Sequence, residues 1–179
     1  GVLWIGTDDG NVQVSKDGGN TWTEVGKNIP GVNHEYYVSG LEASWYDAGT
    51  AYVALDGHRN DDMKPYIFKT TNYGQSWTAV SGSLPEWGCV NSIRQDPVNR
   101  TLLYAPTEFG FYISLDDGAH WKPFMPNLPT FRADDVLVHP REHDLILATH
   151  SRGIWIMDDI SALQSLTAER LDQNSGLFA

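Results

Sequence analysis

The sequence contains a single cysteine, Cys89, among 179 residues. One cysteine cannot form an internal disulfide, so a fold held together by disulfide bonds is excluded, while the cellular compartment is not decided by this count. Cys89 comes just before an expected strand. We predict that it is a small buried residue and not a nucleophile.

Basic residues and long apolar runs are also scarce. The 12 Lys and Arg residues face 23 Asp and Glu residues, which gives a formal net charge of −11. This balance argues against nucleic acid as a partner, because clustered cations bind phosphate backbones. No apolar run is long enough to span a membrane as a helix. HExxH, CxxC, GxSxG and phosphate-binding glycine loops are absent, and we predict no cofactor.

One short motif, by contrast, occurs three times. The pattern is Ser/Thr-x-Asp/Asn-x-Gly-x-x-Trp, and its copies span residues 15–22, 70–77 and 114–121. An Asp or Asn side chain can accept hydrogen bonds from a turn backbone, and Gly can adopt a positive φ without steric cost. The motif therefore predicts a tight turn between two strands. We expect its Trp to pack between neighbouring repeat units, and leave the roles of Trp45 and Trp87 open.

The motif belongs to a longer repeat of about 44 residues, the separation of Trp77 and Trp121. Each unit has a strand, a hairpin of two β-branched or aromatic runs, the motif turn and a final strand. Four antiparallel strands repeated at this length are typical of propeller blades. We predict an all-β propeller segment over residues 1–160, with about two complete and two partial blades. Residues 161–179 are predicted to be a C-terminal extension or linker that begins with a helical turn capped by Ser161.

The three motif copies resemble the Asp-boxes, or BNR repeats, of sialidase-type and sortilin-like β-propellers. Residues 46–54, 107–110 and 153–161 also resemble large secreted bacterial proteins of the sortilin-like or glycosyl-hydrolase-like type. The resemblance implies an extracellular or periplasmic location and part of a longer propeller. It implies no single activity, because the motif recurs in hydrolases, receptors and assembly factors.

Propeller topology sorts the loops onto two faces. The motif turns lie on one face, so we interpret Asp17, Asn72 and Asp116 as structural residues. The turns between second and third strands share the other face with the connections between blades, and loops on a rigid scaffold often carry binding residues. The candidates on that face are Asp8, Asp9, His58, Arg59, Asp61, Asp62, Glu108, Phe109, His150 and Arg152, joined by His34, Glu35, Tyr36, Trp87 and Arg132.

Two functions fit this set of residues. The favoured hypothesis is a binding or scaffold module, not an enzyme, that contacts a protein, peptide or glycan on this face. The alternative is a xyloglucanase- or sialidase-like glycoside hydrolase with Asp8 or Asp9 and Glu108 as its carboxylate pair. In the sialidase version, Arg59, Arg132 and Arg152 would mimic an arginine triad.

Two further expectations concern metals and blade edges. Asp56, His58, Asp61 and Asp62 crowd one loop without the regular oxygen spacing of a calcium site, so we predict a solvated loop and no metal. At the incomplete blades, we expect the open strand edges to pair with the remainder of the propeller or with a second copy of the chain.

Overall fold

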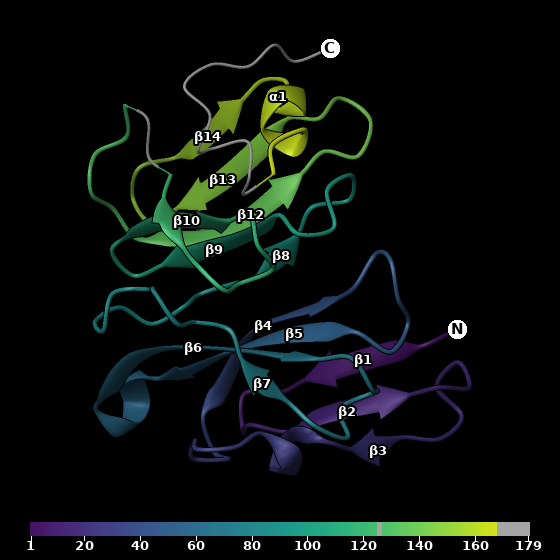
Figure 1. The fold of residues 1–179 in the computed structure, drawn as a ribbon. Helices are drawn as coiled ribbons and strands as arrows, with labels where there is room; N and C mark the ends of the chain where they lie inside the picture. The colour runs from purple at the N-terminus through teal and green to yellow at the C-terminus, as the bar shows by residue number, and fades with distance from the viewer. Residues whose placement is uncertain (125–126, 168–179) are drawn as a thin grey trace.

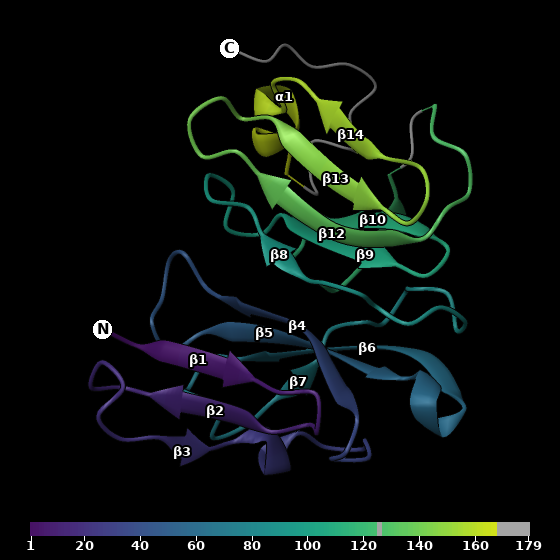
Figure 2. The same ribbon diagram turned by 180° about the vertical axis from the view of Figure 1, so that it is seen from behind.

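The computed structural model describes residues 1–124 and 127–167, which form four antiparallel sheets (Figures 1 and 2). We call these sheets blades 1 to 4 in chain order. Blade 1 contains β1 (Leu3–Gly6), β2 (Val12–Ser15) and β3 (Thr23–Glu24). Blade 2 contains β4 (Tyr37–Ala43), β5 (Ala51–Gly57), β6 (Asp62–Thr70) and β7 (Thr78–Ala79). Blade 3 contains β8 (Arg94–Gln95), β9 (Leu103–Thr107), β10 (Gly110–Ser114) and β11 (Lys122–Pro123). Blade 4 contains β12 (Ala133–Val138), β13 (Leu145–Thr149) and β14 (Ile154–Met157).

Within each blade, strands that are consecutive in the chain are neighbours in the sheet. Blades 2 and 3 have all four strands of the repeat. In blade 1 the motif turn lies between β2 and β3, so its strands correspond to the second, third and fourth of a complete blade. The strands of blade 4 correspond to the first, second and third. The prediction of two complete and two partial all-β blades is confirmed.

The motif turns are built alike in all three copies. In the first copy, Ser15 Oγ accepts a hydrogen bond from the backbone N–H of Gly19 at 2.8 Å, and Asp17 Oδ1 accepts one from Thr21 at 2.9 Å. Gly19 has a φ of 97°, which favours a residue without a side chain. Equivalent pairs of bonds form in the turns at residues 70–77 and 114–121. The acidic or amide side chain thus holds the turn itself, as predicted.

Three apolar clusters lie between consecutive blades. The indole N–H of Trp77 in blade 2 donates to the Val25 carbonyl of blade 1 at 3.1 Å. That of Trp121 in blade 3 donates to the Val80 carbonyl, just after β7, at 2.7 Å. Both rings are buried, so their predicted packing role is confirmed. Trp22 is different, because it is 36% exposed and its indole bonds to Gly19 in its own turn.

The predicted sorting of the loops is seen in blades 3 and 4. The turn after β9 lies beside the segment that leads into β8, where Val90 forms an isolated bridge to Thr107. In blade 4, the His150 N–H after β13 donates to the Arg132 carbonyl just before β12, at 3.0 Å. In these two blades, the turn between the second and third strands therefore lies next to the connection that enters the blade.

Short helices complete the described chain. The 3-10 helices η1 (Gly26–Asn28) and η2 (His58–Asn60) follow β3 and β5, and helix α1 (Ser161–Gln164) follows β14. The expected cap is wrong, because Ile160 occupies the cap position and Ser161 is already helical, with its hydroxyl donated to Asp159. Among the described residues, no helix has the length and apolarity needed to cross a membrane.

Candidate functional site

A groove of about 520 Å³ runs along the first strands of blades 2, 3 and 4. We call it the central groove. Its walls combine guanidinium groups, carboxylates, amide and hydroxyl groups, and more of the lining surface is polar than apolar. It is lined by Tyr37, Ser39, Gly40, Leu41, Asp56, His58, Arg59, Asn91, Ser92, Arg94, Arg132, Asp134 and Asp135.

The floor of the groove is fixed by one repeated contact. Ser39 Oγ donates to the Val90 carbonyl at 2.6 Å, and Asn91 Nδ2 donates to the Ala133 carbonyl at 2.7 Å. Both side chains occupy the same position of the repeat, and each joins its blade to the next. Gly40 allows this close approach, since a Cβ there would lie 2.9 Å from the Ser92 Cα atom.

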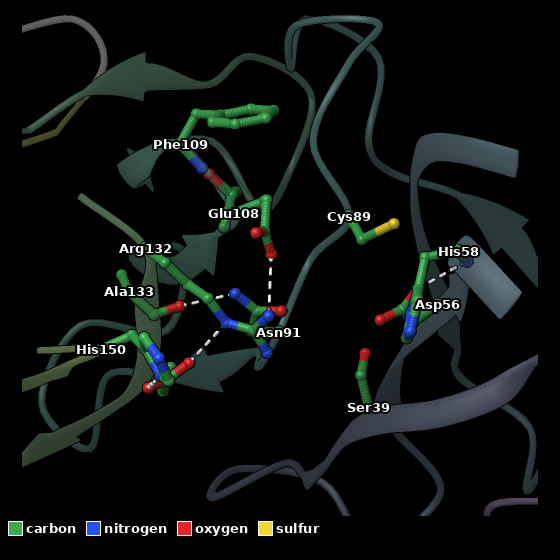
Figure 3. A network of polar contacts seen from close by, with 12 residues as sticks. Ser39, Asp56, His58, Cys89, Asn91, Glu108, Phe109, Arg132, Ala133 and His150 are labelled. Atoms are coloured by element: carbon green, nitrogen blue, oxygen red, sulfur yellow. Dashed lines mark hydrogen bonds and ion pairs between the residues drawn. The ribbon is translucent and has the colours of Figure 1, made fainter. Parts of the chain in front are cut away.

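At one end of the groove, Arg132 organises a cluster of charges (Figure 3). Its Nε atom lies 2.7 Å from Asp134 Oδ1, and its Nη1 atom lies 3.1 Å from Glu108 Oε2. His150 Nδ1 lies 3.9 Å from the other oxygen of Asp134. The hydrogen bond to Asp134, with the charge of Glu108, raises the pKa of Arg132. The guanidinium remains charged and is oriented by two carboxylates, while nearly half of the side chain stays exposed.

The opposite wall in Figure 3 carries Asp56 and His58. Asp56 Oδ1 accepts a hydrogen bond from the His58 backbone N–H at 2.8 Å, and His58 Nδ1 lies at the same distance. Burial raises the pKa of Asp56, but the bonds from His58 and the Cys89 thiol outweigh it, and the net pKa is lowered. Arg59 lies over the Tyr37 ring, 5.4 Å from its centroid.

Cys89 lies behind this wall and is 2% exposed. Burial raises the pKa of its thiol to about 12, and the hydrogen bond to Asp56 adds to the effect. Since the thiolate is the nucleophilic form of cysteine, this environment keeps Cys89 unreactive. The predicted burial of Cys89 is confirmed.

Arg94 is a groove residue that sequence reasoning missed. Its Nη2 atom lies 3.1 Å from Asp135 Oδ1 in the next blade, and its Nη1 atom lies 3.8 Å from Glu42 Oε2 in the preceding blade. Burial raises the pKa of Glu42, and Arg94 partly opposes that shift. Asn91, Ser92, Asp134 and Asp135 were missed as well. The signal that could have found them is the run of polar residues at the start of each first strand.

Several predicted residues lie outside the groove. Asp8 and Asp9 are exposed in the hairpin of blade 1, where the Thr7 hydroxyl donates to Asp9. Asp62 accepts hydrogen bonds from the hydroxyls of Tyr36 and Tyr66, at 2.8 and 2.7 Å. Exposed side chains also include those of His34, Glu35, Asp61, Trp87, Phe109 and Arg152.

The structure therefore brings together His58, Arg59 and Arg132 from the predicted set, with Glu108 and His150 joined to them through Arg132 and Asp134. Arg152 does not line the groove with Arg59 and Arg132. Within residues 1–124 and 127–167, no three His, Cys, Asp or Glu side chains gather as metal ligands would.

The sequence resembles one curated enzyme over part of its length. It is 29% identical over 121 residues to an oligoxyloglucan-reducing end-specific xyloglucanase from Emericella nidulans. The match covers 62% of this chain and 14% of the enzyme. No family model matches the sequence.

Solved structures show the same fold at lower identity. The GH74 xyloglucanase from Xanthomonas campestris superposes with a TM-score of 0.69 and 14% identity, over 89% of this chain and 27% of the enzyme. YCF48 bound to D1 peptide superposes with a TM-score of 0.61 and 16% identity, over 87% of this chain and 47% of that protein. The chain thus spans less than half of each of these three proteins. Together with the four sheets, these likenesses establish that the chain has a β-propeller fold.

Proposed function

We propose that this chain is a binding module of an extracytoplasmic Asp-box β-propeller protein, and that it holds a peptide segment in the central groove. The groove itself carries the proposal, because three guanidinium groups and three carboxylates line a space of about 520 Å³. A peptide backbone presents donors and acceptors in alternation, which a balanced lining of this kind can pair. A polyanionic ligand would instead require an excess of cations.

Arg132 is the residue on which we expect ligand contact to depend most. Its guanidinium is aimed by Asp134 and Glu108, and a planar guanidinium can hold a carboxylate or carbonyl group with two parallel hydrogen bonds. Two carboxylates that fix its direction reduce the ordering cost when a ligand binds. The YCF48 structure, with a bound peptide, offers a precedent for peptide binding on this fold.

The test uses peptide phage display against the immobilised chain, followed by calorimetric titration of a selected peptide. We expect Arg132→Met and Asp134→Asn to weaken binding about tenfold or more, the cost of a lost charge-assisted hydrogen bond. Arg141→Met is the matched control, because Arg141 lies in the turn after β12 with its side chain 82% exposed. Selection of no peptide, or equal weakening by all three substitutions, would contradict the proposal.

A glycoside hydrolase is the second candidate, favoured by the likeness to the xyloglucanase. In that case Asp8 or Asp9 and Glu108 form the predicted carboxylate pair, one as general acid and the other as base or nucleophile. The assay is release of reducing sugar from xyloglucan oligosaccharides. Loss of about 100-fold or more in both Asp8→Asn and Glu108→Gln would support this function. Unchanged activity in either variant excludes that residue from the pair.

A further inference from the structure

The guanidinium groups of the central groove differ in how their charge is balanced within the protein. Arg132 lies 2.7 Å from Asp134 Oδ1 and 3.1 Å from Glu108 Oε2. Arg94 also lies between two carboxylates, at 3.1 Å and 3.8 Å. Each of these two cations is therefore outnumbered by the acidic groups that orient it.

Arg59 lines the same groove but has no such partner. It lies in η2, is exposed, and its guanidinium carbon is 5.4 Å from the centroid of the Tyr37 ring. Among residues 1–124 and 127–167, no carboxylate is paired with it, and no group accepts a hydrogen bond from its side chain. The nearby acid of the groove wall, Asp56, accepts instead from the backbone N–H of His58 at 2.8 Å.

This difference in charge balance decides which ligand group each arginine can take. At Arg132, a ligand carboxylate would meet two negative charges beside one positive charge, so repulsion opposes pairing. A neutral carbonyl oxygen can still accept a hydrogen bond there. At Arg59, a carboxylate meets a positive charge that no acidic group contacts. More distant charges act weakly, because the Debye length is about 8 Å at physiological salt.

Tyr37 adds to this effect by holding the Arg59 side chain in place. A cation over an aromatic face is attracted by the ring, and a side chain that is already ordered loses less entropy when a ligand binds. The planar guanidinium also matches a carboxylate, to which it can donate two parallel hydrogen bonds. Arg59 is therefore suited to recognise a carboxylate, as Arg132 is suited to recognise a carbonyl.

Contact with a tyrosine ring is not by itself the distinguishing feature. Arg100 lies over the Tyr46 ring, 5.8 Å from its centroid, and among the described residues it also has no carboxylate partner. Arg100 does not line the central groove, whereas Arg59 does. The groove residues come from blades 2, 3 and 4, and none belongs to the edge strands β1 and β14.

We infer that the peptide held in the central groove carries a carboxylate, and that this carboxylate pairs with Arg59. Arg132 binds a neutral carbonyl of the same peptide. This inference rests on the proposed function and adds the chemistry of its ligand. An Asp or Glu side chain or a free C-terminus can supply the carboxylate, and the groove then prefers an acidic peptide to its amide counterpart.

The test uses hexapeptide libraries on the immobilised full chain. One library has acetyl and amide caps, with each position fixed in turn as Glu or Gln. The other has a free C-terminus and is compared with its amide-capped form. The best acidic peptide and its amide counterpart are then titrated by calorimetry. We expect the acid to bind about fivefold or more tightly than the amide, in the upper range of partly exposed ion pairs.

A preference for Glu over Gln in the capped library identifies a side-chain carboxylate as the source. A preference confined to the library with a free C-terminus identifies the terminal carboxylate. Either result supports the inference, because the pairing with Arg59 is the same in both.

Three protein variants assign the preference to a residue. Arg59→Met should reduce the ratio of the two Kd values to within about twofold of unity, and should change the Kd of the amide peptide by no more than about twofold. Arg100→Met is the matched control and should keep the ratio. Arg132→Met should weaken both peptides by a similar factor, since it contacts a group that they share.

The outcomes separate this inference from the proposed function. If no peptide binds, both are overturned. If peptides bind without preferring a carboxylate, the proposed function stands and this inference fails. It fails as well if the preference persists in Arg59→Met, or if Arg100→Met or Arg132→Met removes it instead.

Discussion

The three motif tryptophans offer a direct test of how neighbouring blades stabilise one another. Trp22 and Trp121 hold the same motif position, but Trp121 packs against a preceding blade and Trp22 bonds within its own turn. Substitution of each by Ala therefore removes the same side chain from two different environments. We predict that Trp121→Ala is strongly destabilising and that Trp22→Ala is not.

The magnitudes follow from burial. Trp121 is 5% exposed and packs among side chains of blades 2 and 3, so its truncation should cost about 3–5 kcal/mol of unfolding free energy. Trp22 is 36% exposed, and its loss should cost about 1 kcal/mol or less. Trp121→Phe keeps most of the apolar contact but leaves the Val80 carbonyl without its donor. A cost of about 1–3 kcal/mol is expected for that variant.

Urea unfolding and thermal melts followed by circular dichroism measure these differences without relying on tryptophan fluorescence. For a chain of this length, each kcal/mol lowers the melting temperature by roughly 2–4 °C, so Trp121→Ala should melt about 6–20 °C below the wild type. Trp22→Ala should melt within about 4 °C of it. Equal shifts for the two Ala variants would refute the argument that blade contact, and not the motif turn, gives Trp121 its role.

Three other predictions concern individual buried or hydrogen-bonded groups. Asp96→Ala should lower the unfolding free energy by about 3–5 kcal/mol and increase hydrogen exchange in α1, because the fully buried carboxylate accepts hydrogen bonds from the Gln164 amide and the Tyr104 hydroxyl, and both donors would lose their acceptor. The backbone N–H and hydroxyl of Thr21 lower the pKa of Asp17 to about 2. Because this is below the unfolded value of about 3.9, Asp17 stabilises the fold above pH 4, and the urea midpoint should fall as the pH drops from about 4 to 2, less steeply in Asp17→Asn. Cys89 should resist iodoacetamide at pH 8 in the native protein and react in urea, as mass spectrometry would show.

The blade architecture could be predicted because the residues that determine each turn lie close together in the sequence. Each motif contains a hydroxyl, a carboxylate or amide, a glycine and a tryptophan within eight residues. The hydroxyl and the carboxylate or amide accept hydrogen bonds from backbone N–H groups of the turn, and the glycine adopts a positive φ. The period of the repeat then fixes the number of strands in a blade. What the motif cannot show is whether its Trp has a neighbour, since that depends on a blade elsewhere in the chain. Trp22 and Trp121 look alike in sequence and differ in structure for this reason.

The central groove was harder to predict because its lining comes from three separated strands. Arg94 of blade 3 forms an ion pair with Asp135 of blade 4, and no local sequence pattern predicts a contact between residues this far apart in the chain. Attention to loops identified His58, Arg59 and Arg132, which lie where strands begin and end. It missed the polar residues within the first strands. These were visible in the repeat as non-apolar side chains at positions where a sheet core would need apolar ones.

Asp134 shows how a break in the repeat can identify a functional position. Ser39 and Asn91, its equivalents in blades 2 and 3, both donate a hydrogen bond to a backbone carbonyl of the next blade. An ionised carboxylate accepts hydrogen bonds and cannot donate one, so Asp134 is unable to make that contact. It orients Arg132 instead, at the end of the groove. Positions that depart from the pattern of a repeat are often functional positions. For this reason we propose that ligand recognition depends on Arg132 and Asp134 and not on Ser39 and Asn91, which keep the repeated hydrogen bond.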